Sequence, residues 1–243
     1  MSNRNNKYPY ACKLQMPFDR PFSDEDWFVD LVKNTIPSYW WDWQPQYRDI
    51  EYVLHPLKEE HFSERKEIIK WDPMFPRYFG QIDITDNEIS GEFIHPRFTR
   101  LLSDRGLEII NWDVFITPPN MRLSGHKDTE TETVKLNFAH QFTPDISQQN
   151  YLKETDDVVY KDGNEAGDTD VRESMLGGEV IHWHNLSNEW NQPSLTNVGL
   201  WHEVINRSPQ PRICLSYQLK LKKHRHVSLY QEVYPLLEDL IIE

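Results

Sequence analysis

The sequence predicts a mainly β protein with flanking helices, in which the strands form a double-sheet jelly roll or cupin-like barrel, that is, a double-stranded β-helix. Two observations favour this fold class. Between residues 107 and 222, several short segments are rich in β-branched and aromatic residues, and Gly, Pro and Asn separate them. No helical pattern lies between these segments, as the crossovers of a parallel α/β sheet would require, so that architecture is the weaker alternative.

Five strands are predicted with defined bounds. They span residues 107–116, 132–142, 179–186, 200–207 and 212–221. The last strand has the clearest alternation, since Leu215, Tyr217 and Leu219 share one face, which can be buried under helices. Arg212 and Ser216 share the opposite face, and we expect them to point into the space that the barrel encloses.

Helices are predicted before and after these strands. Residues 23–35 begin with an N-capping serine and acidic residues in the first turn, which indicates a helix. A short helix is expected at 99–104, where Gly106 ends it. Apolar residues in helical phase predict a C-terminal helix over 229–241, which Pro235 should kink or restart.

The length of 243 residues fits a single domain that covers the whole chain. Its expected parts are a helical and irregular N-terminal extension packed on the core (1–106), the β core (107–222) and the C-terminal helix (223–243). The acidic segment 153–175 is predicted to be a solvated loop or mobile flap. The aromatic run at 39–43 is interpreted as core packing in preference to a pocket wall.

Composition excludes several classes of protein. A net charge of −13 argues against binding to a nucleic-acid backbone, which requires clustered Lys and Arg. The two cysteines, Cys12 and Cys214, lie in no paired spacing, so the sequence predicts neither a disulfide framework nor a thiolate zinc site. No apolar run approaches the roughly 18 residues of a membrane span. We therefore expect a soluble, cytoplasmic protein without a membrane partner.

Two pieces of the sequence supply metal-ligand side chains. His126 and Asp128 lie two positions apart, so on an extended chain their imidazole and carboxylate project from the same side. His202 belongs to a later predicted strand, which a barrel can bring next to this pair. Two histidines and one carboxylate form the facial triad of non-haem Fe(II) oxygenases, which leaves open positions on the metal. Arg212, ten positions after His202, carries a planar guanidinium that can pair with a carboxylate through two hydrogen bonds. Ser216 lies on the same face of the predicted strand 212–221.

The sequence resembles the Fe(II)/2-oxoglutarate-dependent dioxygenases through four residues in a fixed order: His126, Asp128, His202 and Arg212. The stretches HEVIN at 202–206 and RICLS at 212–216 are similar to short phage and bacterial members, near the prolyl and aspartyl/asparaginyl hydroxylase-like branches. A motif like LNF at 136–138 also follows the His-x-Asp pair in such relatives. The resemblance covers residues 107–222, and the carboxylate of Asp128 departs from the aspartyl/asparaginyl branch, which usually lacks it.

The resemblance implies a cofactor, a co-substrate and a reaction. The implied catalytic residues and Fe(II) ligands are His126, Asp128 and His202. Arg212 and Ser216 would hold the distal carboxylate of 2-oxoglutarate, and Asn137 would lie beside this co-substrate. With O2, such an enzyme releases succinate and CO2 and hydroxylates an unactivated carbon. The implied substrate is an amino acid, a peptide side chain or a small metabolite.

Several alternatives stay open at this point. His182 and His184 share a strand face and compete as metal ligands, although no arginine step follows them and hydrogen-bonding or pocket-lining roles are preferred. Lys135 shares a face with Asn137 and could pair with the co-substrate, or it could belong to polar packing inside the barrel. Two other functions use the same fold: a cupin-like metal enzyme such as an isomerase that needs no 2-oxoglutarate, and a non-catalytic binding protein.

Overall fold

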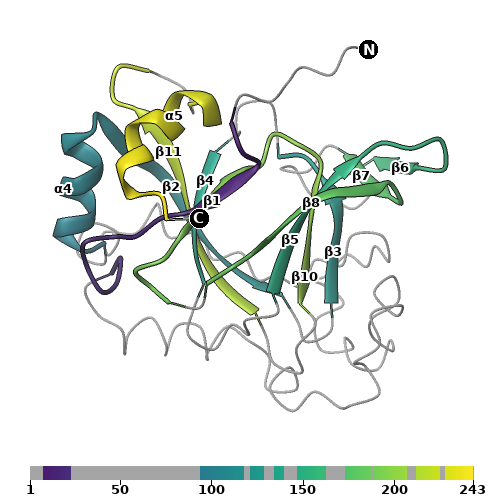
Figure 1. Cartoon of the computed structure of the whole chain (residues 1–243), viewed down its shortest axis with the longest axis horizontal. Helices are drawn as coiled ribbons and strands as arrows, with labels where there is room; N and C mark the ends of the chain where they lie inside the picture. The colour runs from purple at the N-terminus through teal and green to yellow at the C-terminus, as the bar shows by residue number, and fades with distance from the viewer. Residues whose placement is uncertain are drawn as a thin grey trace.

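Two antiparallel β-sheets that lie face to face make up most of the structure (Figure 1). The computed structural model describes residues 8–22, 94–117, 121–128, 134–139, 147–162, 173–187, 189–206, 212–224 and 228–242. One sheet has, in spatial order, the strands β1 (Ala11–Lys13), β9 (Ser194–Asn197), β4 (Val134–Ala139), β11 (Arg212–Leu221) and β2 (Leu107–Thr117). The other sheet has β6 (Val159–Asp162), β7 (Glu173–Leu176), β3 (Met121–His126), β10 (His202–Asn206), β5 (Ser147–Lys153) and β8 (Glu179–Asn185).

The strand order within these ranges is that of a double-stranded β-helix. Besides β1 and the β6–β7 hairpin, one sheet holds β9-β4-β11-β2 and the other holds β3-β10-β5-β8. The chain therefore passes repeatedly from one sheet to the other, as it does in a double-sheet jelly roll. The predicted fold class, a mainly β jelly-roll or cupin-like barrel with flanking helices, is confirmed.

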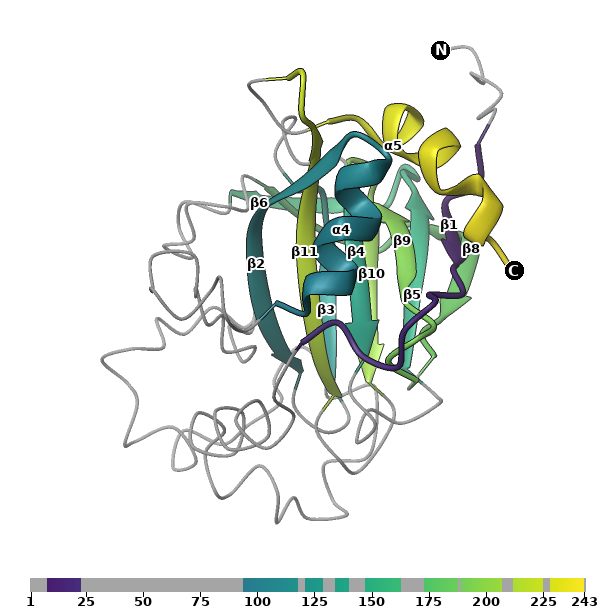
Figure 2. The same cartoon turned by 90° about the vertical axis from the view of Figure 1, so that its left-hand side faces the viewer.

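The hydrophobic core lies on the outer side of the five-stranded sheet. Two helices, α4 (Pro96–Asp104) and α5 (Tyr230–Leu237), cover this face, and a 3-10 turn at Glu238–Leu240 follows α5 (Figure 2). α5 passes through Pro235 and continues to Leu237, so this proline neither ends nor restarts the helix. Because proline has no backbone N–H, it removes one hydrogen bond from the helix.

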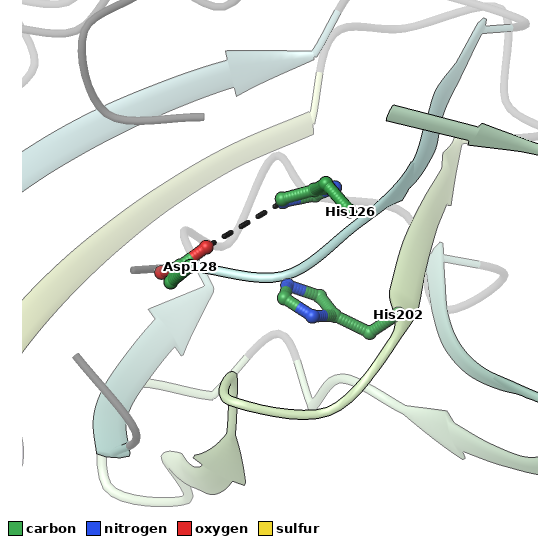
Figure 3. Close-up of side chains that lie close together, drawn as sticks. All are labelled: His126, Asp128 and His202. Atoms are coloured by element: carbon green, nitrogen blue, oxygen red, sulfur yellow. Dashed lines mark ion pairs between the residues drawn. The ribbon is translucent and has the colours of Figure 1, made fainter. Parts of the chain in front are cut away.

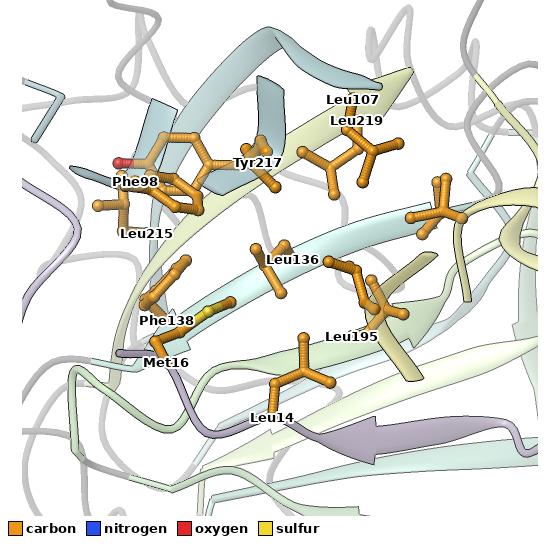
Figure 4. Packing of buried hydrophobic residues seen from close by; sticks show 14 of the residues in the cluster. Leu14, Met16, Phe98, Leu107, Leu136, Phe138, Leu195, Leu215, Tyr217 and Leu219 are labelled. Atoms are coloured by element: carbon orange, nitrogen blue, oxygen red, sulfur yellow. The ribbon is translucent and has the colours of Figure 1, made fainter. Parts of the chain in front are cut away.

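Aromatic and aliphatic side chains fill the space between sheet and helices (Figure 4). The ring of Phe98, on α4, lies 5.0 Å from the ring of Tyr217 on β11 and 5.4 Å from the ring of Phe138 on β4, measured between centroids. Leu215 and Leu219 belong to the same buried cluster. The prediction that this face of the last strand packs under helices is therefore confirmed.

The face between the two sheets is polar. Strand alternation turns a set of buried polar side chains of the five-stranded sheet toward the other sheet: Lys135, Asn137, Ser194, Thr196, Arg212, Ser216 and Gln218. A direct bond joins the two sheets, since His184 Nε2 on β8 lies 2.8 Å from Ser194 Oγ on β9. Apolar packing thus stabilises the outer face of the five-stranded sheet, whereas the barrel interior is available for chemistry.

The structure also corrects and extends the predicted elements. The five predicted strands appear as β2, β4, β8, β10 and β11, and the last has the expected bounds, Arg212–Leu221. The acidic segment 153–175 is not wholly a loop, because Val159–Asp162 pairs antiparallel with Glu173–Leu176. Sequence analysis also missed β1, β3, β5 and β9, and of these β5 and β9 are too polar to give an apolar alternation.

Some predictions concern residues outside the described ranges. These are the helix at 23–35, the aromatic run at 39–43 and most of the irregular segment 48–98. Among the helices that are described, none is long and apolar enough to cross a membrane.

Candidate metal centre

His126 and His202 occupy neighbouring positions on two antiparallel strands. His126 is the last residue of β3, His202 is the first residue of β10, and the two are register partners. Their rings lie 4.3 Å apart between centroids. A Cβ atom on Gly125 would lie 2.7 Å from Cδ1 at the end of the Leu152 side chain and 3.0 Å from the Met175 carbonyl oxygen, so a side chain before His126 would require these neighbours to shift. This close packing fixes the end of β3 from which His126 projects.

Asp128 completes the group two residues beyond β3 (Figure 3). Its backbone N–H donates to the carbonyl of Val198, at 3.0 Å, which holds this turn against the opposite sheet. Asp128 Oδ1 lies 3.7 Å from His126 Nε2, and ligand atoms of His126, Asp128 and His202 all lie within 4.8 Å of one another. The three side chains point toward one another, and their ligand atoms could hold one metal ion.

Hydrogen bonding selects the nitrogen that His202 offers to a metal. His202 Nδ1 lies 2.9 Å from the backbone carbonyl of Leu200, which can only accept a hydrogen bond. The proton therefore sits on Nδ1, and the lone pair of Nε2 is left for a metal. Burial and the neighbouring His126 lower the pKa of His202 to about 3, so the imidazole is neutral at pH 7, which is the form that binds metals.

Asp128 is ionised at the same pH. Burial by itself raises the pKa of this carboxyl, but attraction to Lys135 and to the histidines outweighs burial and holds the pKa below its usual value. Lys135 Nζ lies 2.7 Å from Asp128 Oδ2, and both side chains are largely buried. Lys135 thus contacts the carboxylate of the triad, a role that sequence analysis had not assigned to it.

The predicted co-substrate residues lie on the inner face of the five-stranded sheet. Ser216 on β11 and Asn137 on β4 are register partners, and Arg212 lies further along β11 on the same face. All three are buried, and burial lowers the pKa of Arg212. Asn137 Nδ2 donates to Thr196 Oγ1 at 2.9 Å. Lys135, two residues before Asn137, connects this row of polar groups to Asp128.

The six-stranded sheet adds residues that the sequence did not single out. Tyr151 on β5 is the register partner of His202 on its other side, and it is fully buried. Gln149 Nε2 donates to the Tyr151 hydroxyl at 3.2 Å. Because Ser147–Lys153 reads as a polar segment, no periodicity marked this strand; only the pairing of β5 with β10 places Tyr151 beside the triad.

The two competing histidines have other partners. His184 hydrogen-bonds Ser194, and His182 stacks on Tyr10, with ring centroids 5.2 Å apart. In the part of the chain that the structure describes, neither belongs to the group that could hold a metal. His184 thus has the hydrogen-bonding role that was preferred for it, whereas a pocket-lining role for His182 stays a prediction.

Comparison with known proteins gives structural similarities alone, since no family model and no curated protein matches the sequence. A cupin-domain protein from Bordetella pertussis Tohama I is 11% identical, with a TM-score of 0.26 over 58% of this chain and 93% of that one. A non-haem monooxygenase, apo ThoJ, is 11% identical, with a TM-score of 0.29 over 60% of this chain and 69% of that one.

A formate complex of the oxalate decarboxylase from Lactobacillus farciminis is 9% identical, with a TM-score of 0.26. The match covers 53% of this chain and 29% of the decarboxylase. All of these TM-scores are low, and the fold assignment therefore rests on the strand order within the two sheets. Together, strand order and site geometry describe a cupin-like barrel with a group of two histidines and one aspartate suited to a metal ion.

Proposed function

We propose that this protein is a non-haem Fe(II)- and 2-oxoglutarate-dependent oxygenase. The observation that carries the proposal is the convergence of His126, Asp128 and His202 at one end of the barrel, with their ligand atoms within 4.8 Å of one another. Two imidazoles and a carboxylate suit Fe(II) and leave positions for other ligands. A group of this composition also fits other divalent metals, so the co-substrate assignment depends on the residues that line the barrel.

Arg212 and Ser216 support 2-oxoglutarate as the co-substrate. A guanidinium buried on the inner face of β11 is suited to a carboxylate that enters the barrel, because it stays charged and can form two parallel hydrogen bonds. The hydroxyl of Ser216 lies on the same face and can donate a further hydrogen bond to that carboxylate. Asn137, its register partner, would line the co-substrate on the adjacent strand.

The reaction that we propose is hydroxylation of an unactivated carbon in an amino acid, a peptide side chain or a small metabolite. Fe(II), 2-oxoglutarate and O2 supply the oxidising power when bound, and succinate and CO2 are released. The protein's own contribution is to bind and orient: the triad fixes the metal, and the sheets exclude water from a largely buried interior. The net charge of −13 disfavours a polyanionic substrate.

The test is spectroscopic and needs no substrate. Fe(II) and 2-oxoglutarate are added without oxygen, and the visible charge-transfer band of a chelated 2-oxoacid is titrated in wild type and Arg212→Ala. We expect the band in wild type and a requirement for roughly tenfold or more 2-oxoglutarate in the variant, since a hydrogen bond to a charged group is lost. Arg105→Ala is the control, because Arg105 pairs with Asp239, 2.7 Å away, on an exposed part of the surface.

The absence of the charge-transfer band would contradict the co-substrate assignment. If metal binds to wild type and no band forms at any 2-oxoglutarate concentration, the co-substrate assignment is wrong. The protein would then be a cupin-like metal protein without 2-oxoglutarate turnover, either an isomerase-type enzyme or a binding protein.

A further inference from the structure

The two oxygens of Asp128 face different partners. Oδ1 faces His126, at 3.7 Å from its Nε2, and so lies on the side of the candidate metal centre. Oδ2 faces the ammonium of Lys135, at 2.7 Å. The carboxylate is therefore divided between a side that faces the histidines and a side that is already occupied by a cation.

Lys135 is held in this place by its strand. It lies within β4, between β9 and β11 in the five-stranded sheet, and only 8% of its surface is exposed. Its ammonium also lies 5.1 Å from the centroid of the Phe115 ring on β2, a contact that favours a cation. Withdrawing this ammonium from Asp128 would leave two buried charges without compensation, which is costly.

We propose that Lys135 is a positioning residue that keeps Asp128 Oδ2 away from the metal, so that Asp128 supplies one ligand atom. This inference rests on the proposed metal centre. Carboxylates bind metals through one oxygen or through both, and the second oxygen takes a position on the ion that a solvent or substrate atom could use. With two histidine nitrogens and one oxygen, an octahedral ion keeps three open positions. These suffice for a bidentate co-substrate and one further ligand, whereas a bidentate Asp128 would leave two.

The test counts exchangeable water ligands on the metal and uses no 2-oxoglutarate. Mn(II)-loaded protein is measured by pulsed EPR in 17O-labelled water. We expect three water ligands in wild type and in Lys135→Arg, which keeps the cation, and two in Lys135→Met, where Oδ2 is released. Lys135→Gln should also show two, since its amide is one bond too short to reach Oδ2; it serves if Lys135→Met does not fold.

A matched control separates this effect from the loss of any paired lysine. Lys220→Met removes a partly exposed ion pair with Glu108, 2.6 Å away, near the C-terminal end of β11, and it should keep three water ligands. Three water ligands in both Lys135→Met and Lys135→Gln would overturn the inference and leave the metal centre intact. If wild type binds no Mn(II), the metal centre itself is wrong and the inference falls with it. Failure of 2-oxoglutarate to bind would not affect the count.

Discussion

Two serines on the inner face of the five-stranded sheet differ in one respect that matters for stability and for binding. Ser216 and Ser194 are each 1% exposed. Ser194 Oγ hydrogen-bonds His184, whereas Ser216 Oγ has no hydrogen-bond partner within the described ranges. A buried hydroxyl without a hydrogen-bond partner destabilises a folded protein. A polar ligand that enters the barrel would supply the hydrogen bond that the Ser216 hydroxyl lacks.

Replacement of each serine by alanine should therefore have opposite effects on the free energy of unfolding. Ser194→Ala should lower it by about 1 kcal/mol, because a buried hydrogen bond is lost. Ser216→Ala should leave it unchanged or raise it by up to about 1 kcal/mol, because an unsatisfied group is removed. Urea unfolding of the metal-free proteins measures both values.

The Ser216→Ala variant should also bind 2-oxoglutarate less tightly. In the anaerobic band titration, Ser216→Ala should need roughly tenfold more 2-oxoglutarate than wild type, since the co-substrate loses one hydrogen bond to its carboxylate. A large loss of stability in Ser216→Ala together with unchanged 2-oxoglutarate binding would show that Ser216 has a structural role instead.

Cys12 on β1 predicts a pH dependence of stability on the alkaline side. Burial raises the pKa of its thiol from 9.0 to about 11, although a contact with the Tyr230 hydroxyl opposes this shift. The unfolded chain thus loses this proton at lower pH than the folded protein does. The contribution of Cys12 is complete below pH 9 and is lost as the pH rises through 11.

Between pH 7.5 and 10.5, wild type should therefore lose about 2 kcal/mol more of its free energy of unfolding than Cys12→Ala does. Urea unfolding at the two pH values measures the difference, and the comparison with the variant subtracts the titration of other groups. Equal losses in the two proteins would contradict the prediction.

At the scale of elements, the turn between β7 and β8 depends on two glycines with the same backbone conformation but different surroundings. Gly177 and Gly178 have φ values of +88° and +90°, which L-residues rarely adopt. A Cβ on Gly177 would have no atom nearer than 3.7 Å, whereas one on Gly178 would lie 2.9 Å from the carbonyl oxygen of Lys153 at the end of β5. Only Gly178 is needed for close approach of a neighbouring strand.

Alanine at these positions should separate backbone strain from steric contact. Gly177→Ala should lower the free energy of unfolding by about 1–2 kcal/mol through the left-handed backbone alone. Gly178→Ala should cost at least about 1 kcal/mol more, because the strand end must also shift. Thermal and urea unfolding of the two variants measure the costs, and equal values would show that the end of β5 moves away from the added Cβ at no cost.

At the scale of the whole molecule, the two faces of the five-stranded sheet differ in composition. Apolar side chains on the outer face of the five-stranded sheet pack under α4 and α5, while the space between the sheets holds buried polar groups and the candidate metal centre. His126 and His202 belong to neighbouring strands, and Asp128 is bonded through its backbone to Val198 after β9 of the other sheet. A metal ion held by these side chains should therefore stabilise the entire barrel.

Metal binding should thus raise the unfolding temperature. At a free Mn(II) concentration of about 100 times the dissociation constant, the stabilisation is roughly 2.7 kcal/mol. For a protein of this size this corresponds to a rise of roughly 5–10 °C. A chelator should reverse the rise, which calorimetry or circular dichroism can follow.

A pair of histidine variants tests which side chains bind the metal. His202→Ala should abolish the rise. His184→Ala should lower the starting temperature, since the bond to Ser194 is lost, but should keep the metal-induced rise. If the rise were instead lost in His184→Ala and kept in His202→Ala, the assignment of ligands would be wrong.

The sequence by itself determined the fold class and the chemical groups of the site. The alternation from Arg212 to Leu221 predicted the bounds of β11 and the face, with Leu215, Tyr217 and Leu219, that packs under the helices, because side-chain period is a local property of the sequence. The spacing of His126 and Asp128, with His202 and Arg212 further along, predicted which groups could form a metal and anion site. The strands β5 and β9 escaped prediction because their residues are largely polar.

Only the tertiary structure decided how those groups meet. The ion pair of Lys135 with Asp128 and the hydrogen bond of His184 to Ser194 both cross between the two sheets, and Tyr151 lies beside His202 through the pairing of β5 with β10. They depend on strand order and register, which long-range packing sets and which no local pattern records. The division of the Asp128 oxygens between a lysine and a histidine has the same origin, since β3 and β4 lie in opposite sheets.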